Sequence, residues 1–135
     1  MNADERGYAQ IDQITEKVIG AAYKISNALG CGILEKVYEN ALVYELRKSG
    51  LMVEQQRAID VLYDGKTVGF YISDMFVEDV LPIELKVAKA LDEIHFAQAL
   101  NFLRASNCRV ALLINFGTPR VEVKRIVNNY REPCL

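Results

Sequence analysis

Two acidic residues and a lysine in an otherwise apolar stretch are the side chains of this sequence best suited to chemistry. Asp74 is followed ten residues later by Glu84, and Lys86 comes two residues after Glu84. Side chains of a β-strand alternate between its faces, so Glu84 and Lys86 share one face and their apolar neighbours share the other. Two carboxylates with water suit Mg²⁺ or Mn²⁺, and a metal ion held there can activate water against a phosphate ester. From the same face, an ammonium can orient that water or stabilise the transition state.

The pairing register between the two strands decides whether the two acids meet. A two-residue hairpin would set Asp74 opposite Ile83 and away from Glu84, whereas an odd-numbered connection or a bulge would bring the acids together. We predict that one of these devices places Asp74 beside Glu84, and we expect Ile72 and Phe76, on the face of Asp74, to belong to the core. The alternative is an exposed edge strand whose charges face solvent, because this spacing is common by chance.

Periodic apolar residues predict the elements that position these side chains. Spacings of three and four residues are typical of amphipathic helices, and alternation is typical of half-buried strands. Helices are expected over about 11–29, 34–49 and 93–105, and strands over about 59–63, 68–76, 81–87 and 108–116; residues 121–127 read as a strand or a short helix, and we favour the strand. The strand 108–116 follows a crossover helix, so we expect it to lie parallel to 81–87. This order predicts one α/β domain, over residues 8–135, with a mixed β-sheet and helices on both faces, after a flexible tail at 1–7.

Composition and charge limit the classes of protein to consider. The chain has 135 residues, of which 51% are hydrophobic, enough for one domain with a substantial core. Its formal net charge of −2 does not favour non-specific nucleic-acid binding, so such binding must rest on local groups. The three cysteines form no CxxC pair, which argues against a disulfide framework or a cysteine zinc site and favours a reducing cytoplasm. No apolar run approaches the ~20 residues that cross a membrane, and residues 1–7 lack an apolar signal core.

Basic residues gather late in the chain, where they outnumber the acids. They could contact a nucleic acid, or they could form an ordinary solvated face. The group comprises Arg104, Arg109, Arg120, Lys124, Arg125 and Arg131.

Several short motifs, taken together in order and spacing, resemble the GxxExxY protein family. Residues 32–38 read Gly-Ile-Leu-Glu-Lys-Val-Tyr, and matching segments follow at 63–65, 69–74, 83–86, 95–98 and 112–117. That family is placed in the PD-(D/E)xK nuclease-like superfamily, and the resemblance covers about residues 11–127. It implies a restriction-endonuclease-like core and a metal-dependent nuclease that hydrolyses DNA or, less readily, RNA.

The resemblance also implies roles for single residues. Asp74, Glu84 and Lys86 match the catalytic acid, acid and lysine of the superfamily. Glu35 matches an extra acid of some relatives, so that Glu35, Asp74 and Glu84 would hold Mg²⁺ or Mn²⁺. Gln98 matches a glutamine on the helix after the core strand and would support the substrate or Lys86.

Some of these positions also have a plainer interpretation. Phe102 stands where related nucleases carry the tyrosine of a QxxxY pattern, so the ring is kept and the hydroxyl is missing. From the residues alone, Glu35 is a first-turn acid that favours the helix dipole, and Tyr38 packs in the core. His95, the single histidine, lies beside Gln98 and could contact a phosphate or position a site residue, but a structural role is the simpler explanation.

The sequence therefore leaves three functions open. The first is the nuclease, and the second is a catalytically silent nuclease-like module that binds nucleic acid or protein. The third is a homodimer whose paired surface matters more than its chemistry, since one active site cuts one strand. Serine or cysteine nucleophile chemistry is poorly supported, because the chain has one histidine and no paired base.

Overall fold

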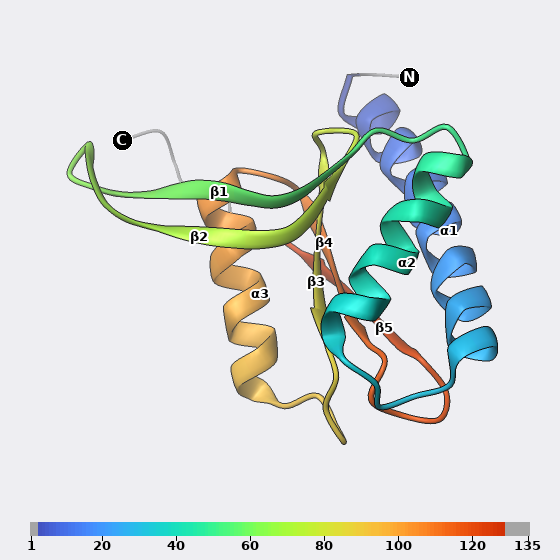
Figure 1. Ribbon diagram of the computed structural model, residues 1–135. Coiled ribbons are helices and arrows are strands. Elements are labelled where there is room, and N and C mark those ends of the chain that lie inside the picture. The colour runs from blue at the N-terminus through green and yellow to red at the C-terminus, as the bar shows by residue number, and fades with distance from the viewer. Residues whose placement is uncertain (1–2, 129–135) are drawn as a thin grey trace.

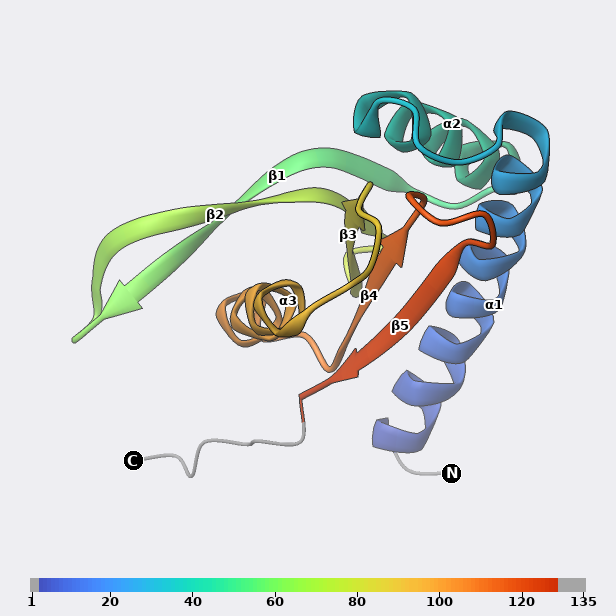
Figure 2. The same cartoon turned by 90° about the horizontal axis from the view of Figure 1, so that it is seen from below.

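The computed structural model describes residues 3–128, which contain three helices and five strands. Their order is α1 (Ala3–Leu29), α2 (Glu35–Lys48), β1 (Val53–Tyr63), β2 (Lys66–Val77), β3 (Leu81–Lys86), α3 (Glu93–Ser106), β4 (Val110–Asn115) and β5 (Glu122–Val127). The strands form one sheet in the order β1-β2-β3-β4-β5, with β3 and β4 parallel and the other neighbours antiparallel. Helices α1 and α2 lie on one side of the sheet and α3 on the other (Figures 1 and 2). The predicted mixed sheet with helices on both faces is confirmed.

The main core lies between the central strands and the α1–α2 pair. Every second side chain of β3 and β4, such as Leu85 and Ile114, is fully buried against this helix pair. The apolar stripes of α1 and α2, which include Val18 and Leu42, supply the opposite wall. Strand β4 is buried along its whole length because α3 covers its second face. The strand that carries Glu84 and Lys86, β3, lies between β2 and β4 in the sheet and buries its other face against the α1–α2 pair.

The hairpin of β1 and β2 extends past the helices, and its distal part, residues 58–72, is called the arm below (Figure 1). Its two-residue turn, Asp64-Gly65, has positive φ at both positions, as the twist of a tight hairpin requires. The expectation that Ile72 belongs to the core is wrong, because 51% of it is exposed. Phe76, nearer the body on the same strand, is 3% exposed, as expected.

Helix α1 begins earlier than the sequence indicated. Residues 3–7, which were expected to form a flexible tail, are part of α1 here, and residues 1–2 lie outside the described part of the chain. No proline stands before residue 8, so nothing in the sequence stops the helix from continuing backward past its apolar stripe. Although α1 has 27 residues, no helix within residues 3–128 combines the length and apolar character needed to cross a membrane.

The chain after β3 lies tightly against the chain after β4, and Gly117 permits this. Asn115 joins the two segments: its Oδ1 accepts from the Ala88 and Gly117 amides at 3.0 and 2.9 Å, and its Nδ2 donates to the Ala88 carbonyl at 3.0 Å. Asn115 thus satisfies backbone groups of both segments. A Cβ on Gly117 would lie 2.2 Å from the Ala88 carbonyl oxygen, so no side chain fits there.

We therefore expect Gly117→Ala to lower the free energy of unfolding by about 1–3 kcal/mol, as overpacking does. Denaturant unfolding followed by circular dichroism measures this loss. Gly20→Ala is the matched control, because a Cβ at this mid-helix position meets nothing within 4 Å and should stabilise α1 by up to about 1 kcal/mol. A Gly117→Ala variant as stable as the wild type would mean that the two segments separate without cost.

Candidate active site

A three-residue connection between β2 and β3 brings the two predicted acids together. Residue Val77 pairs with Leu81, and Met75 pairs with Ile83. The next pair in this antiparallel register is Asp74 and Glu84, and directly opposed residues point to the same face of a sheet. The connection therefore has the odd length that the sequence required.

The carboxyl groups of Asp74 and Glu84 lie in a partly dry environment and oppose each other's ionisation. Burial, together with the adjacent Asp74 carboxylate, raises the pKa of Glu84 to about 8. Burial also raises the pKa of Asp74, although the Leu85 amide lowers it by donating to Oδ2 at 2.7 Å. Oε1 of Glu84 is buried and has no hydrogen-bond partner among residues 3–128. Such an atom calls for a positive or donating group, and a cation satisfies that need.

Lys86 lies within electrostatic reach of all three predicted acids. Burial raises the pKa of Glu35, at the start of α2, and the Asp74 carboxylate raises it further, while the Lys86 ammonium lowers it. The same ammonium lowers the pKa of Asp74 and Glu84, where burial has the larger, opposite effect. Glu35 thus approaches the pair from α2. In the described part of the chain, however, no three acidic, histidine or cysteine side chains lie close enough to share a metal ion.

A pocket of about 270 Å³ lies over Glu84 and Lys86. Its walls come from β2 and from α3, which follows the acid-bearing strand in sequence. They include Tyr71, Ile72, His95, Gln98, Ala99, Asn101 and Phe102. A pocket with a charged floor and largely apolar or aromatic walls can hold a ligand that is charged at one end and flat or apolar at the other.

A family model for the PD-(D/E)XK nuclease superfamily matches residues 12–126. The chain belongs to the PD-(D/E)XK nuclease superfamily. The match spans the sheet and the helices around it, and it includes Glu35, Asp74, Glu84 and Lys86. Nucleases of this superfamily generally use divalent metal ions. The narrower assignment to the GxxExxY family remains a prediction.

A solved structure supports the fold of this PD-(D/E)XK protein. The structure titled "Crystal structure of SSO0001" matches it with a TM-score of 0.52 and 19% sequence identity. The match covers 94% of this chain and 63% of that one, so the chain spans less than two thirds of the length of that protein. At this identity the likeness shows a shared fold. Among curated proteins, none matches the chain.

Helix α3 contributes His95 and Gln98, two of the site residues proposed from the sequence, to the lining of the pocket of this PD-(D/E)XK domain. His95 also closes the start of the helix: its Nδ1 accepts from the Asp92 amide at 3.2 Å, and its own amide donates to Asp92 Oδ1 at 3.1 Å. Because Nδ1 accepts a hydrogen bond, the neutral ring carries its proton on Nε2. The structural role and a contact to a ligand are therefore compatible.

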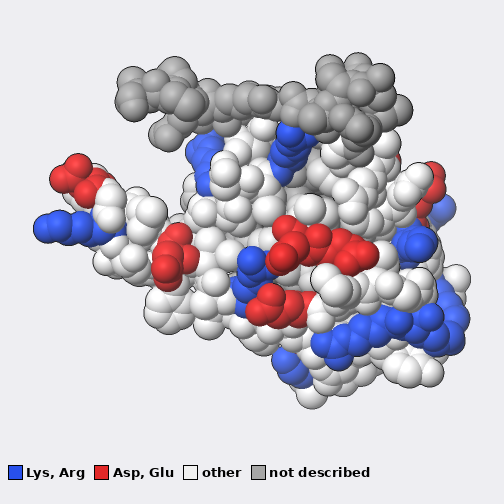
Figure 3. All heavy atoms as spheres, turned by 90° about the horizontal axis from the view of Figure 1, so that it is seen from above, with Lys and Arg blue, Asp and Glu red and all other residues white. Residues whose placement is uncertain are grey.

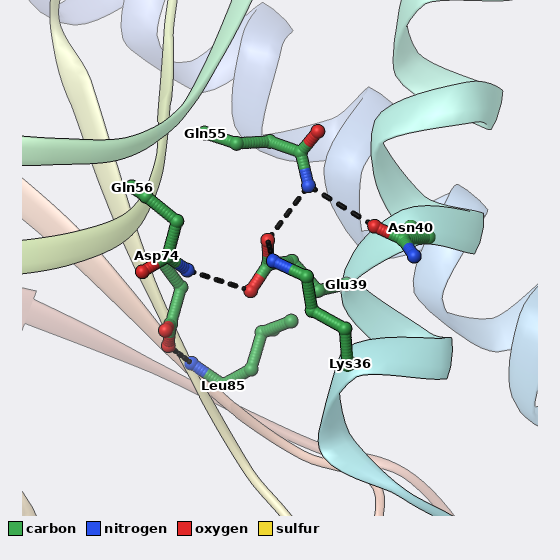
Figure 4. Close-up of polar contacts among 7 residues, drawn as sticks. All are labelled: Lys36, Glu39, Asn40, Gln55, Gln56, Asp74 and Leu85. Atoms are coloured by element: carbon green, nitrogen blue, oxygen red, sulfur yellow. Dashed lines mark hydrogen bonds and ion pairs between the residues drawn. The ribbon is translucent and has the colours of Figure 1, made fainter.

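Glu39 is a buried acid that the sequence analysis missed. It is 2% exposed, and Gln55 and Gln56 donate to its two oxygens at 2.6 and 2.9 Å, with the Lys36 ammonium at 2.8 Å. Figure 4 shows this network joining α2 to β1. Gln56 has a positive φ of 54°, which lets two successive glutamines reach one carboxylate.

Glu39 also acts on the candidate catalytic acids. After burial, its charge is among the influences that raise the pKa of Asp74 and of Glu35. Figure 4 shows Asp74, bonded to the Leu85 amide, next to the Glu39 network. A signal was present in the sequence, since Glu39 lies one turn after Glu35 and follows Tyr38 on the buried side of α2.

Tyr38 fixes the loop that presents Glu35. Its ring stacks on Phe116 with centroids 4.4 Å apart, and its hydroxyl donates to the Gly30 carbonyl at 2.6 Å. The hydroxyl also accepts from the Ile33 amide at 3.3 Å. The prediction that Tyr38 packs in the core is confirmed. Tyr38 influences the site indirectly, because it holds the loop before α2, the helix that begins at Glu35.

Proposed function

We propose that this protein is a metal-dependent nuclease that hydrolyses phosphodiester bonds of DNA or, less readily, of RNA. The observation that most supports the proposal is the convergence of Asp74, Glu84 and Lys86. Glu84 and Lys86 line one pocket, the Asp74 carboxyl group lies opposite Glu84 on the neighbouring strand, and the charges act on one another. A solvated edge strand would leave such groups apart and in water, whereas these are partly buried.

The acid pair is suited to Mg²⁺ or Mn²⁺. Both ions prefer oxygen ligands, and Asp74 and Glu84 offer carboxylate oxygens, one of them a buried Glu84 atom without a donor. We assign these two residues as ligands, and Glu35, which is not close enough to form a three-acid site with them here, as an acid that acts on the pair through its charge. When bound, the ion would polarise the phosphate and lower the pKa of a water molecule.

The remaining residues of the pocket act on substrate and water. The Lys86 ammonium would stabilise the negative charge that develops on the phosphate oxygens, and it would orient the attacking water. Gln98 and His95 would support the substrate or Lys86, because an amide N–H and an imidazole N–H are common phosphate donors. Tyr71 and Phe102 offer aromatic walls to a nucleotide.

Surface charge alone does not select the substrate. Figure 3 shows acidic and basic side chains interspersed on the face seen from above. Two basic residues from the C-terminal part of the chain bind α1 instead of facing a substrate. Arg125 donates to Asp12 at 2.7 Å, and the Arg109 guanidinium lies over the Tyr8 ring. Arg131 lies outside the described residues. Recognition is therefore proposed to rest on the pocket, and a homodimer would supply one such site for each strand of a duplex.

The thiols agree with a reducing compartment, and we propose the cytoplasm. Cys31 and Cys108 are both free. Burial raises the pKa of the Cys108 thiol, which makes it a poor nucleophile at neutral pH. Neither cysteine lines the candidate active site.

Titration calorimetry with Mn²⁺ tests the metal site directly. The wild type is expected to bind the ion and to release protons at neutral pH, because Glu84 must ionise against a pKa of about 8. Asp74→Asn removes a ligand charge, so its affinity should fall by at least about tenfold, as the loss of part of a metal site does. Asp64→Asn is the matched control, since asparagine tolerates the positive φ of this exposed turn.

Cleavage assays on DNA and RNA with Mn²⁺ present then identify the substrate. A folded wild type that binds no metal would contradict the proposal. The remaining explanation would then be a catalytically silent nuclease-like module that binds nucleic acid or protein. Metal binding with equal affinity in Asp74→Asn would contradict the assignment of the site.

A further inference from the structure

The pocket over Glu84 and Lys86 also has an exposed aromatic ring in its wall. Tyr71 lines the pocket from β2 and is 40% exposed, so part of its ring is open to a ligand. Its contact with the buried Phe102 ring, at 6.3 Å between centroids and 51° between planes, holds the tyrosine against α3. A ring fixed in the wall of a pocket offers a flat surface on which a second flat ring can stack.

Two side-chain amides lie on the α3 wall of the same pocket. Gln98 and Asn101 are three residues apart on the helix, so they lie next to each other on its surface. Both residues are exposed, and neither side-chain amide is hydrogen-bonded within residues 3–128. A carboxamide donates from its nitrogen and accepts at its oxygen, and this combination can pair with the edge of a nucleobase.

The lining of the pocket thus matches the parts of one nucleotide. The end that holds Glu84 and Lys86 suits a phosphate, and the Tyr71 ring suits the face of a base. The cavity has a volume of about 270 Å³, just below the ~300 Å³ at which the usual range of ligand pockets begins. A space of this size takes one nucleotide rather than a base pair.

We propose that the pocket takes one unpaired nucleotide, with its base stacked on Tyr71 and the edge of the base at Asn101, so that the substrate is a single strand. This inference rests on the proposed function and narrows its substrate to strands that are single or locally unpaired. A base inside a duplex is stacked on both faces and paired along its edge, so it reaches neither the ring nor the amide until it is turned out of the helix. A single strand avoids the cost of that step.

The charges on the surface also favour a single strand over a duplex. Binding to a duplex depends largely on cations that reach many phosphates. Several cations of this chain instead form ion pairs with acids: Lys24, Lys36, Lys48, Arg57 and Arg125. Figure 3 shows acids among the cations on the face seen from above. Stacking on an aromatic ring adds affinity for a single strand without an extended basic surface.

Fluorescence anisotropy with labelled strands, in a chelator so that no metal-dependent cleavage occurs, tests the inference. The probe is an oligothymidylate or an oligouridylate, whichever binds more tightly. The wild type is expected to bind this strand at least about tenfold more tightly than a duplex of the same length, and more tightly than a strand of that length without bases. Tyr71→Ala should weaken binding of the single strand by about tenfold, the loss typical of one stacked base. Its affinity for the abasic strand should equal that of the wild type, because the phosphates are unchanged.

Phe70→Ala is the matched control. Phe70 precedes Tyr71 in β2 and is 63% exposed, yet it does not line the pocket. Its affinity for the single strand should stay close to that of the wild type. Circular dichroism shows whether Tyr71→Ala is folded. If it is not, Asn101→Ala, at an exposed position of α3, takes its place and should weaken binding of the single strand but not of the abasic one.

Several outcomes would overturn the inference. They are a folded wild type that binds no strand, equal affinity for the single strand and for the duplex or abasic strand, and a Phe70→Ala variant as weak as Tyr71→Ala. A free nucleoside monophosphate that displaces the strand at equal concentration would also do so, since the pocket would then serve a small molecule.

Binding in a chelator is independent of cleavage, so the inference and the proposed function can fail separately. A wild type that prefers single strands but cleaves nothing with Mn²⁺ contradicts the nuclease alone. A wild type that cleaves a duplex as fast as a single strand contradicts the single-strand inference alone.

Discussion

Lys86→Met is expected to lower metal-dependent cleavage by about 10³-fold, the loss typical when a group that stabilises transition-state charge is removed. The methionine keeps most of the length of the side chain and removes the ammonium that influences all three acids. Lys86 ends β3 beside the pocket and is only partly buried, so we expect the fold to survive. Single-turnover cleavage of labelled DNA and RNA with Mn²⁺ measures the rate, and thermal unfolding checks the fold.

The control for this loss is Lys17→Met, because Lys17 is exposed on α1 and outside the pocket. Its cleavage rate should match that of the wild type. Calorimetry separates the two possible causes of a slow Lys86→Met variant: metal binding that persists while cleavage is lost would place the effect on the reaction rather than on the ion. Equal rates for the wild type and Lys86→Met would rule out a catalytic role for this lysine.

Local rules were enough to predict most of the fold. Period-two and period-three-to-four spacing located the strands and helices, and the Asp64-Gly65 pair located the tight turn. The apolar run of β4 after a helix was enough to predict its parallel pairing with β3, because a crossover connection favours that arrangement. The helices, strands and turn depend on residues close together in the sequence, and the parallel pairing depends on the general preference of crossover connections.

Burial along β2 could not be predicted, because it depends on where the helices end. Ile72 and Phe76 occupy equivalent positions of the same alternation, yet Phe76 packs against α3, with its ring centroid 6.0 Å from that of Phe102, whereas Ile72 borders the open pocket beside that helix. Towards its tip the arm keeps the alternation of a strand, although its large apolar side chains, such as Val68 and Phe70, are exposed. Alternation thus predicts a strand, but it does not say how much of the strand is covered.

The candidate site could be predicted from its residue types but not in its details. The spacing of Asp74, Glu84 and Lys86 indicated the chemistry, whereas the length of the connection between β2 and β3 was ambiguous. Val80 reads as the first apolar residue of a strand, but it belongs to the turn after Glu78 and Asp79, which have positive φ. One residue more or less in that turn would have moved Asp74 to the opposite face.

Glu39 was hidden for a related reason. Its partners Gln55 and Gln56 are consecutive, and consecutive strand residues normally point to opposite faces. The positive φ of Gln56 is a local exception to this alternation, and the sequence around Gln56 contains no feature that predicts it. A buried acid with three donors is thus a product of the tertiary structure.

The burial of Glu84, which favours binding of a cation, should also lower the stability of the folded protein at alkaline pH when no metal is present. Its pKa rises from an ordinary value of 4.5 to about 8 in the folded chain, because burial and the Asp74 carboxylate both oppose ionisation. The folded state then binds more protons than the unfolded state between these values, so stability falls as pH rises through that window. At about 1.4 kcal/mol per pKa unit, the loss by pH 8.5 amounts to a few kcal/mol.

Glu84→Gln is therefore expected to be more stable than the wild type at pH 8.5 without metal, although it should cleave nothing. Glutamine stays neutral at every pH, so its unfolding free energy should lack most of the decline from pH 5 to 8.5. Denaturant unfolding at both pH values, with a chelator, measures the difference. Glu16→Gln, on the exposed side of α1, should follow the wild-type profile.

Adding Mn²⁺ provides a second measurement, because an ion that binds the folded state stabilises it, and tighter binding gives greater stabilisation. It should restore wild-type stability at pH 8.5 and have little effect on Glu84→Gln, which lacks the buried charge that opposes folding. Identical pH profiles for the wild type and Glu84→Gln would show that Glu84 ionises freely in the folded chain. The acid pair would then be too well solvated to hold an ion in the manner proposed.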